Sequence, residues 1–354
     1  MDTTITARDV IGKDPFGKLL ARLRIQPWQA ALLSLSFFLI YVIVLPIYFD
    51  VWLSKTGLER SSSMDRVNQV GFWIIHPTII FFYVWQSGAI ADLYKYVFPL
   101  APTSVLGKLM RVSRMLHELR NWWVIGAISG GIIVYLGVIF IFEVLGERWY
   151  SVNWLMAILL QCSRFLLFYM IAIIFIRHLI VAFNLNRIYL HVQFPVMIAQ
   201  SKYSAVFDAI TQYGLSFAGF GAMLGFFIAM RNFYGTPVFP EDTIYILGYV
   251  ILMPLAFILP FWQAHVSMRL ARQKALRDIS DKLQDEYDFL MSGSATPDTL
   301  SNSSAKIQTL RTLFDLTERA PTWPFENWSI YRVMVATAFP FVMTGLGYVI
   351  ELFL

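Results

Sequence analysis

The stretch WLMAILLQCSRFLLFYMIAIIFI, residues 154–176, decides the fold of this chain. Arg164 is its only charged residue, and it contains neither Gly nor Pro. A bilayer core of about 30 Å is crossed by roughly 20 consecutive apolar residues in a helix. The stretch is long enough to meet that requirement, and it therefore predicts a membrane-spanning helix.

Six further apolar runs of similar length follow the same pattern. They occupy approximately residues 27–49, 70–91, 122–145, 209–230, 243–266 and 330–352. Each run is continuous, whereas the strands of a membrane β-barrel alternate over roughly 10 residues. Of the 354 residues, 57% are hydrophobic and 14% are charged, against roughly 25% charged in a soluble domain. The sequence therefore predicts an all-α, polytopic membrane protein with seven transmembrane helices.

Lysine and arginine set the expected orientation, because cytosolic loops are enriched in both. The segments 1–26, 95–121, 177–208 and 267–329 carry 21 of these residues, and the opposite loops carry 5. We expect the N-terminus in the cytosol and the C-terminus outside, in a plasma membrane or a bacterial inner membrane. These basic loops account for the net charge of +5, so we expect membrane lipids as partners and no nucleic acid.

This topology divides the chain into four parts. Residues 1–26 form a cytosolic N-terminal segment, and residues 27–266 form a six-helix membrane bundle. Residues 267–329 form a cytosolic helical extension and hairpin between spans six and seven. Residues 330–354 form the final transmembrane helix.

The hairpin prediction rests on two amphipathic segments. Ser267 to Met291 contain no Gly or Pro, and apolar residues such as Leu276 and Leu283 recur at helical spacing. Residues 292–304 are rich in Ser, Thr, Gly and Pro and predict a flexible linker. A second amphipathic helix is expected over about 304–319. The hairpin is either a solvated connector, or an element for gating, oligomerisation or binding a cytosolic protein.

Arg164 is the most unusual residue, because a charge near the middle of a bilayer is costly and is a functional hypothesis by default. We expect its side chain to face the bundle interior with Gln161, and Glu143 near the end of the third span is a candidate partner. One interpretation is a structural ion pair or a set of bonds to backbone carbonyls. The other is an anion-attracting or gating charge.

Two further polar features lie inside predicted spans. His76 precedes Pro77, so it is either a neutral side chain bonded to a carbonyl that the proline frees, or a proton relay. In the last span, one helical face carries four hydroxyl-bearing or aromatic residues: Thr337, Phe341, Thr344 and Tyr348. This face would either line a pore in an oligomer or form hydrogen bonds between helices.

Motifs for catalysis and cofactor binding are missing from the sequence. It has no Walker loop, dinucleotide-binding motif, nucleophile elbow or His-Glu-x-x-His. We therefore predict no catalytic, cofactor-binding or metal site. The weakest of our three functional hypotheses is a membrane-embedded lipid-modifying enzyme, with Asp92, His117, Glu118 and His191 as the polar residues near one interface.

The leading hypothesis is an oligomeric channel or transporter for an ion or small solute, with Arg164 and the last span as candidate permeation or gating elements. The alternative is a non-conducting scaffold or signalling subunit that acts through the hairpin at 267–329. The predicted architecture is similar to that of the insect chemoreceptor channels, with a long extension of span six and a short helix before span seven. The Tyr-rich signature of that family's last span is absent from 329–354.

Overall fold

The structure is a computed structural model, and every element among its described residues is a helix. The described residues are 4–53, 61–118, 121–139, 148–192, 204–233, 254–292 and 297–320, with the separate positions 249, 251, 322, 323, 335, 338, 339 and 342.

The α-helices of the described residues differ greatly in length, and six short π- or 3₁₀-helical pieces lie between some of them. The α-helices are α1 (Ala7–Ile11), α2 (Pro15–Arg22), α3 (Pro27–Leu39), α4 (Leu45–Tyr48), α5 (Arg66–Val70), α6 (His76–Val97), α7 (Thr103–His117), α8 (Trp122–Ile139), α9 (Trp154–Tyr189), α10 (Ser204–Phe233), α12 (Trp262–Met291) and α13 (Pro297–Glu318). The joining pieces used below are η1 (Ile40–Val44), η3 (Gly71–Ile75) and η4 (Phe98–Leu100).

Four of the helical stretches are long and apolar enough to cross a membrane. They are Pro27–Tyr48, Arg66–Leu100, Trp154–Tyr189 and Asp208–Met230. They coincide with four of the predicted spans, which began near residues 27, 70, 154 and 209. The described chain is therefore all-helical with membrane-spanning character.

The other three predicted spans lie wholly or partly outside the described residues. α8 covers the first part of the span predicted at 122–145 and is not among the four. Only parts of the runs at 243–266 and 330–352 are described. The number of seven spans and the orientation of the chain therefore stay predictions.

Two proline residues inside apolar helices are accommodated by π-helical turns. The π-helix η1 immediately precedes α4, which carries Pro46 in its first turn, and η3 immediately precedes α6, which carries Pro77 there. Proline lacks an N–H and its ring clashes with the carbonyl of the preceding turn. A wider turn at that point lets the helix continue through the proline, and such π-bulges often mark functional sites.

The helix α9 is longer than a membrane requires. Its 36 residues rise by about 1.5 Å each, giving roughly 54 Å, against a bilayer core of about 30 Å. The sequence predicted that the span ends at 176, but the helix continues through Tyr189. This continuation is helical because it buries Val181, Leu185 and Ile188 against neighbouring helices. α6 likewise runs past its predicted end at 91, to Val97.

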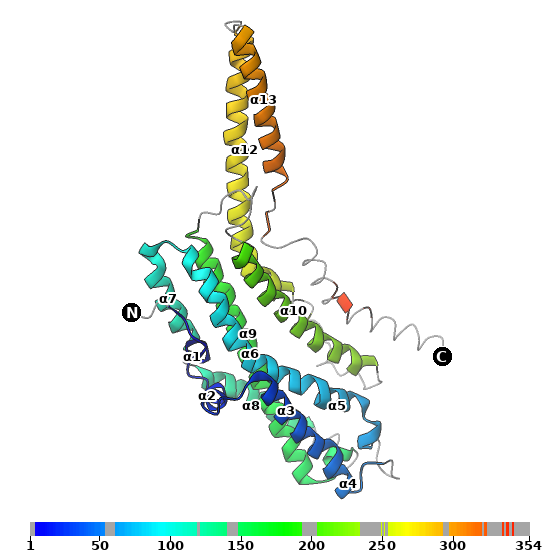
Figure 1. Ribbon diagram of the computed structural model, residues 1–354. Coiled ribbons are helices and arrows are strands. Elements are labelled where there is room, and N and C mark those ends of the chain that lie inside the picture. The colour runs from blue at the N-terminus through cyan, green and yellow to red at the C-terminus, as the bar shows by residue number, and fades with distance from the viewer. Residues whose placement is uncertain are drawn as a thin grey trace, which may run out of the picture.

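The N-terminal segment packs against the bundle. α1 contacts α6 and α7, and α7 contacts α9. Ile5 and Val10 are buried in the same apolar cluster as Leu93 of α6 and Leu185 of α9. In Figure 1, α1, α2 and α7 lie beside α6 and α9. Residues 4–22 are thus part of the folded core.

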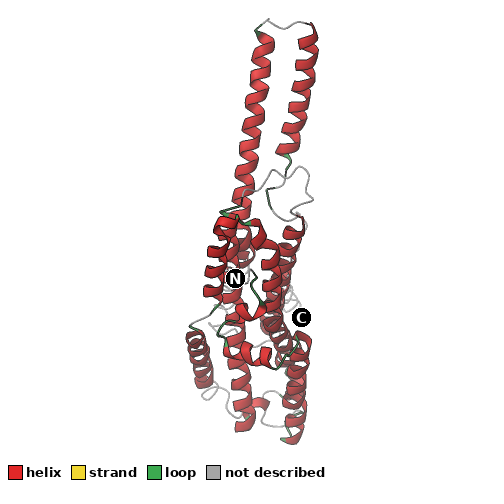
Figure 2. Ribbon diagram, turned by 60° about the vertical axis from the view of Figure 1, so that its left-hand side comes forward, coloured by secondary structure: helices red, strands yellow, loops and turns green. Residues whose placement is uncertain are grey.

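The helices α12 and α13 form the hairpin that the sequence predicts. They lie side by side and project beyond the bundle in both ribbon views (Figures 1 and 2). The predicted linker at 292–304 is wrong in its second half, because α13 already begins at Pro297. Proline is well tolerated in the first turn of a helix, where its missing N–H has no intrahelical partner to lose.

Candidate functional site

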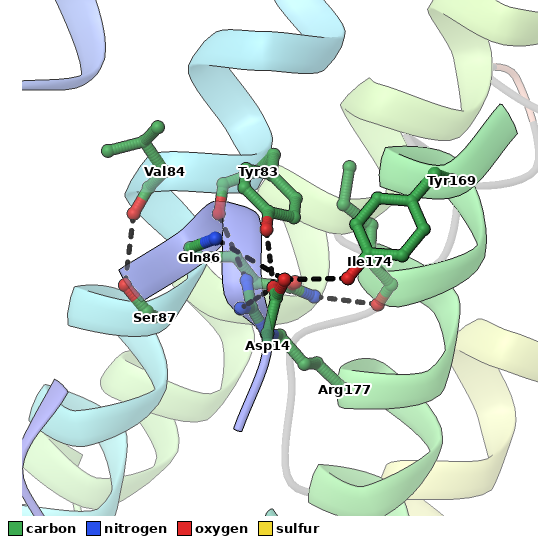
Figure 3. Close-up of polar contacts among 9 residues, drawn as sticks. Asp14, Tyr83, Val84, Gln86, Ser87, Tyr169, Ile174 and Arg177 are labelled. Carbon is green, nitrogen blue, oxygen red and sulfur yellow. Dashed lines mark hydrogen bonds and ion pairs between the residues drawn. The ribbon is translucent and has the colours of Figure 1, made fainter. Parts of the chain in front are cut away.

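A buried carboxylate from the N-terminal segment lies between α6 and α9 (Figure 3). The Arg177 Nη2 atom lies 2.9 Å from Asp14 Oδ2, and the two side chains are 1% and 0% exposed. The Tyr169 hydroxyl donates to Asp14 Oδ1 at 2.7 Å, and the Tyr83 hydroxyl donates to Oδ2. One carboxylate therefore receives three donors from two helices of the bundle.

The local sequence around Asp14 explains how it reaches this position. Asp14 caps the N-terminus of α2 by accepting from the Gly17 backbone N–H at 3.3 Å, and Pro15 follows as the first helical residue. Just before it, Gly12 has φ +58°, and a Cβ there would lie 2.0 Å from the His117 carbonyl oxygen. Only glycine fits this close approach in this backbone conformation. The tight turn between α1 and α2 thus directs Asp14 inward.

The arginine of this pair is held in place by further contacts. Arg177 Nη1 donates to the Tyr83 carbonyl at 3.1 Å, and the guanidinium carbon lies 4.9 Å from the centre of the Tyr83 ring. Arg177 Nε is buried and has no hydrogen-bond partner among the described residues. Two buried charges are tolerated only when they are paired and hydrogen-bonded, so this geometry fixes the N-terminal segment against the bundle.

A second buried network lies towards the α7 end of the same two helices. The Asn184 amide donates to the Tyr94 hydroxyl and to Ser113 Oγ, both at 2.9 Å. The Tyr94 hydroxyl lies 2.9 Å from His117 Nε2. Burial lowers the pKa of His117 to about 3, with a further lowering by the Arg177 charge that Asp9 partly offsets. His117 is therefore neutral at physiological pH.

Two more polar side chains of α6 and α9 bond to buried backbone carbonyls. Gln86 Nε2 donates to the Ile174 carbonyl at 2.9 Å. His178 Nε2 lies 2.7 Å from the Ala256 carbonyl, and its ring stacks on Phe217 at 3.6 Å. These bonds connect α6 to α9, and α9 to the segment that precedes α12.

Three of the candidate residues from the sequence analysis, Gln161, Arg164 and His76, lie towards the start of α9 and of α6. Arg164 is half-buried, and its charge acts on His76 of α6 and on Tyr41 of η1. Gln161 lies one turn earlier, and both polar atoms of its side chain are buried without a hydrogen-bond partner among the described residues. The ring of His76 packs against that of Phe38 at 4.7 Å.

The structure therefore brings three of the predicted site residues into one region: Arg164, Gln161 and His76. The other predicted site residues, Glu143, Thr337, Phe341, Thr344 and Tyr348, lie outside the described residues. The proposed pairing of Arg164 with Glu143 and the predicted stripe on the last span stay predictions.

These contacts form a series along two parallel helices. We call the polar side chains that face the contact between α6 and α9 the polar seam. Its members are His76, Tyr83, Gln86 and Tyr94 on α6, and Gln161, Arg164, Tyr169, Arg177 and Asn184 on α9. The bonds that join the two helices link residues separated by 88, 94 and 90 positions. This nearly constant offset shows that both helices run in the same direction along the seam.

Sequence reasoning missed much of the seam. Asp14 looked like one of several charges in a cytosolic segment, and Arg177 looked like the first basic residue after a span. A signal was present in the run from α5 to α6, where Gln69, His76 and Tyr83 recur at intervals of seven residues. That spacing places them on one helical face.

The four residues of the enzyme hypothesis have separate partners. Asp92 bonds to Lys95, Glu118 pairs with Lys13, and His191 lies against the Arg187 carbonyl, whereas His117 belongs to the Tyr94 network. Among the described residues, no group of three His, Cys, Asp or Glu side chains could hold a metal ion.

Comparison with known proteins gives no relative for this chain. No protein-family model matches it, and neither a curated protein nor a solved structure is significantly similar to it.

Proposed function

We propose that this protein moves a small solute across a membrane along the polar seam, as an oligomeric channel or transporter, and that Arg164 favours anions on this route. The observation that carries the proposal is the series of buried and half-buried polar side chains along α6 and α9. Polar groups inside membrane helices are costly, face the bundle interior and commonly mark a route for ions or substrates.

The position of Arg164 supports this assignment. It lies ten residues after Trp154, the first residue of α9, which corresponds to about 15 Å of helix. That is half the thickness of a bilayer core of about 30 Å. An arginine at this depth attracts anions and repels cations, as charged side chains do in selective pores. The neighbouring Gln161 adds a buried amide that lacks a hydrogen-bond partner among the described residues.

The test is flux of anions and cations from liposomes that contain the purified protein. We expect anion flux in the wild type, and loss of flux or changed selectivity in Arg164→Leu. Arg187→Leu is the matched control, because Arg187 lies on the same helix with its guanidinium 5.6 Å from the ring of the exposed Phe183. Equal anion flux in all three proteins would show that Arg164 does not contribute to the permeation route.

The second candidate is the scaffold or signalling subunit. It is favoured by the hairpin of α12 and α13, whose outer end exposes Phe289, Met291 and Leu300. Exposed apolar side chains grouped on a projecting element are typical of a protein-binding surface. If the wild type shows no flux for any ion tested, this candidate becomes the better explanation. Deletion of residues 284–304 would then abolish binding of the partner.

A further inference from the structure

The contacts of Asp14 are those of a bound anion. Its two oxygens accept from the Arg177 guanidinium and from the hydroxyls of Tyr169 and Tyr83. Arginine together with hydroxyl donors is a common way of binding a carboxylate, because the planar guanidinium matches its shape. All three of these donors belong to the bundle, on α6 and α9, whereas the carboxylate belongs to the N-terminal segment.

The donors exceed what Asp14 uses. Arg177 Nε is buried and has no hydrogen-bond partner among the described residues, while Nη1 is directed to the Tyr83 carbonyl and Nη2 to Asp14. A buried arginine normally satisfies its donors. The unused Nε is therefore a donor of this cluster beyond the three from which Asp14 accepts.

The segment that carries Asp14 is tied to the surface by exposed ionic contacts. Lys13 pairs with Glu118 at 3.0 Å, and Arg114 lies 3.9 Å from Asp9. Exposed pairs of this kind hold weakly and are screened by salt. The docking also includes the bond from the Lys13 backbone N–H to the Glu118 carbonyl at 3.0 Å and the burial of Ile5 and Val10. A gating role for Asp14 requires the segment to withdraw from these contacts as a unit.

The cluster lies on the polar seam between Arg164 and the network of Asn184 and Tyr94. Arg177 follows Arg164 by 13 positions on α9, or about 20 Å along the helix. Counted from Trp154, it lies about 35 Å along α9, just past a bilayer core of about 30 Å. A solute that passes Arg164 would therefore meet Arg177 where the seam leaves the membrane.

We propose that Arg177, Tyr83 and Tyr169 form a binding site for a small carboxylate anion, and that Asp14 occupies it here as a tethered competitor which closes the seam at this point. The inference rests on the proposed transport function for its role in gating. The binding site itself does not depend on transport, so the two are tested separately.

The first experiment measures thermal unfolding of the full-length Asp14→Ala variant in detergent, with and without sodium formate, against sodium chloride at equal ionic strength. We expect a lower Tm than in the wild type and a gain in Tm with formate that chloride does not give. The wild type should show no such gain, because Asp14 fills the site. Adding Arg177→Gln to Asp14→Ala should abolish the gain.

If Asp14→Ala does not yield folded protein, Asp14→Asn replaces it, because asparagine preserves the cap of α2 while removing the charge that competes for Arg177. Formate should then raise the Tm of Asp14→Asn and not that of Asp14→Asn with Arg177→Gln. Absence of a formate-dependent gain in folded Asp14 variants would overturn the site, and the pair would be a structural clamp only.

The second experiment measures formate flux into liposomes. Removing a competitor restores the fraction of protein that is competent to bind, so we expect Asp14→Ala to raise flux at least about tenfold over the wild type. Lys18→Ala is the matched control, because it changes an exposed charged side chain of the same segment. Flux that is the same in the wild type and Asp14→Ala overturns the gating role while the transport function stands. If formate raises the Tm of the Asp14 variants but no variant shows formate flux, the binding site stands and the transport function is contradicted.

Discussion

Asp14 and Arg177 are 163 positions apart in the chain, yet their charged atoms lie 2.9 Å apart with both side chains buried. The pair joins a segment that precedes α3 to the second half of α9. The hydroxyls of Tyr83 and Tyr169 and the Gly17 backbone N–H donate to the same carboxylate. This pair sets the position of the N-terminal segment. Substitution of either residue alone should therefore lower the stability of the folded protein.

Removing one member of the pair should cost more stability than removing both. Arg177→Met leaves the Asp14 carboxylate buried without its counter-charge, so we expect a loss of about 3–5 kcal/mol in the free energy of unfolding. Arg177→Met combined with Asp14→Asn removes both charges and should lose less than Arg177→Met alone. Unfolding in mixed detergent micelles gives the values for a double-mutant cycle. Arg187→Met is the control on the same helix. If the losses in the free energy of unfolding at positions 14 and 177 simply add, the two side chains do not interact as proposed.

Gly12 should be intolerant of any side chain. Gly12→Ala places a Cβ against the His117 carbonyl, in a backbone conformation that costs an L-residue about 1–3 kcal/mol. We expect the N-terminal segment to lose its docked position and to become accessible to limited proteolysis. Gly107→Ala in α7 is the control, because nothing lies within 4 Å of a Cβ there. That change should stabilise the helix by up to about 1 kcal/mol, and equal protease resistance of the two variants would contradict this account.

Acidification should weaken the contact of α7 with α6 and α9. The pKa of His117 falls from 6.5 to about 3 in the folded protein through burial, with Arg177 lowering it and Asp9 raising it. The unfolded chain therefore binds a proton more readily than the folded one between these two values. The contribution of neutral His117 is fully present above pH 6.5 and is lost as the pH falls, at up to about 1.4 kcal/mol per pH unit.

The measurement is the pH dependence of Tm between pH 7.5 and 5 in the wild type and in His117→Gln, whose side chain does not titrate. We expect the Tm of the wild type to fall more steeply with acidification than the Tm of His117→Gln. The difference between the two curves is then the contribution of His117. Parallel curves would contradict this account, because they would show that His117 has the same pKa in the folded and the unfolded protein.

The hairpin should open under acidic conditions. Lys306 and Ser303 lower the pKa of Glu286 below its usual value of 4.5 by hydrogen bonding to the carboxylate. A carboxylate with a lowered pKa stabilises the folded state above its unfolded pKa and loses that contribution as the pH falls through the folded value. We therefore expect α12 and α13 to separate more readily below pH 4.5, starting at the end where Glu286 meets Lys306.

Spin labels at Lys282 and Gln308, in a Cys162→Ser background, report the distance between the two helices. Glu286→Gln should make the distance distribution independent of pH between 6 and 3.5. Asp285→Asn, which changes an exposed neighbour, should keep the response of the parent protein. If the distance still changes with pH in Glu286→Gln, a group other than Glu286 causes the change.

The sequence by itself determined the features that depend on local composition. A run such as 154–176 is helical and apolar whatever its neighbours are, because an isolated segment in lipid must satisfy its backbone bonds internally. The hairpin at 267–329 was likewise readable from helical spacing, and Arg164 with Gln161 could be placed on one turn. His76 was identified by its neighbouring proline, although its proximity to Arg164 required the packing of α6 on α9.

Tertiary structure alone decided where the long helices end and what the N-terminal segment does. α9 continues to Tyr189 because its last turns bury Leu185 and Ile188, and hydropathy gives no sign of that burial. Asp14 carries the same charge as several exposed neighbours in the sequence. Its role arises only when Gly12 turns the chain and Arg177 is presented by a distant helix. Contacts between residues this far apart depend on the packed arrangement of the whole bundle, which no local pattern encodes.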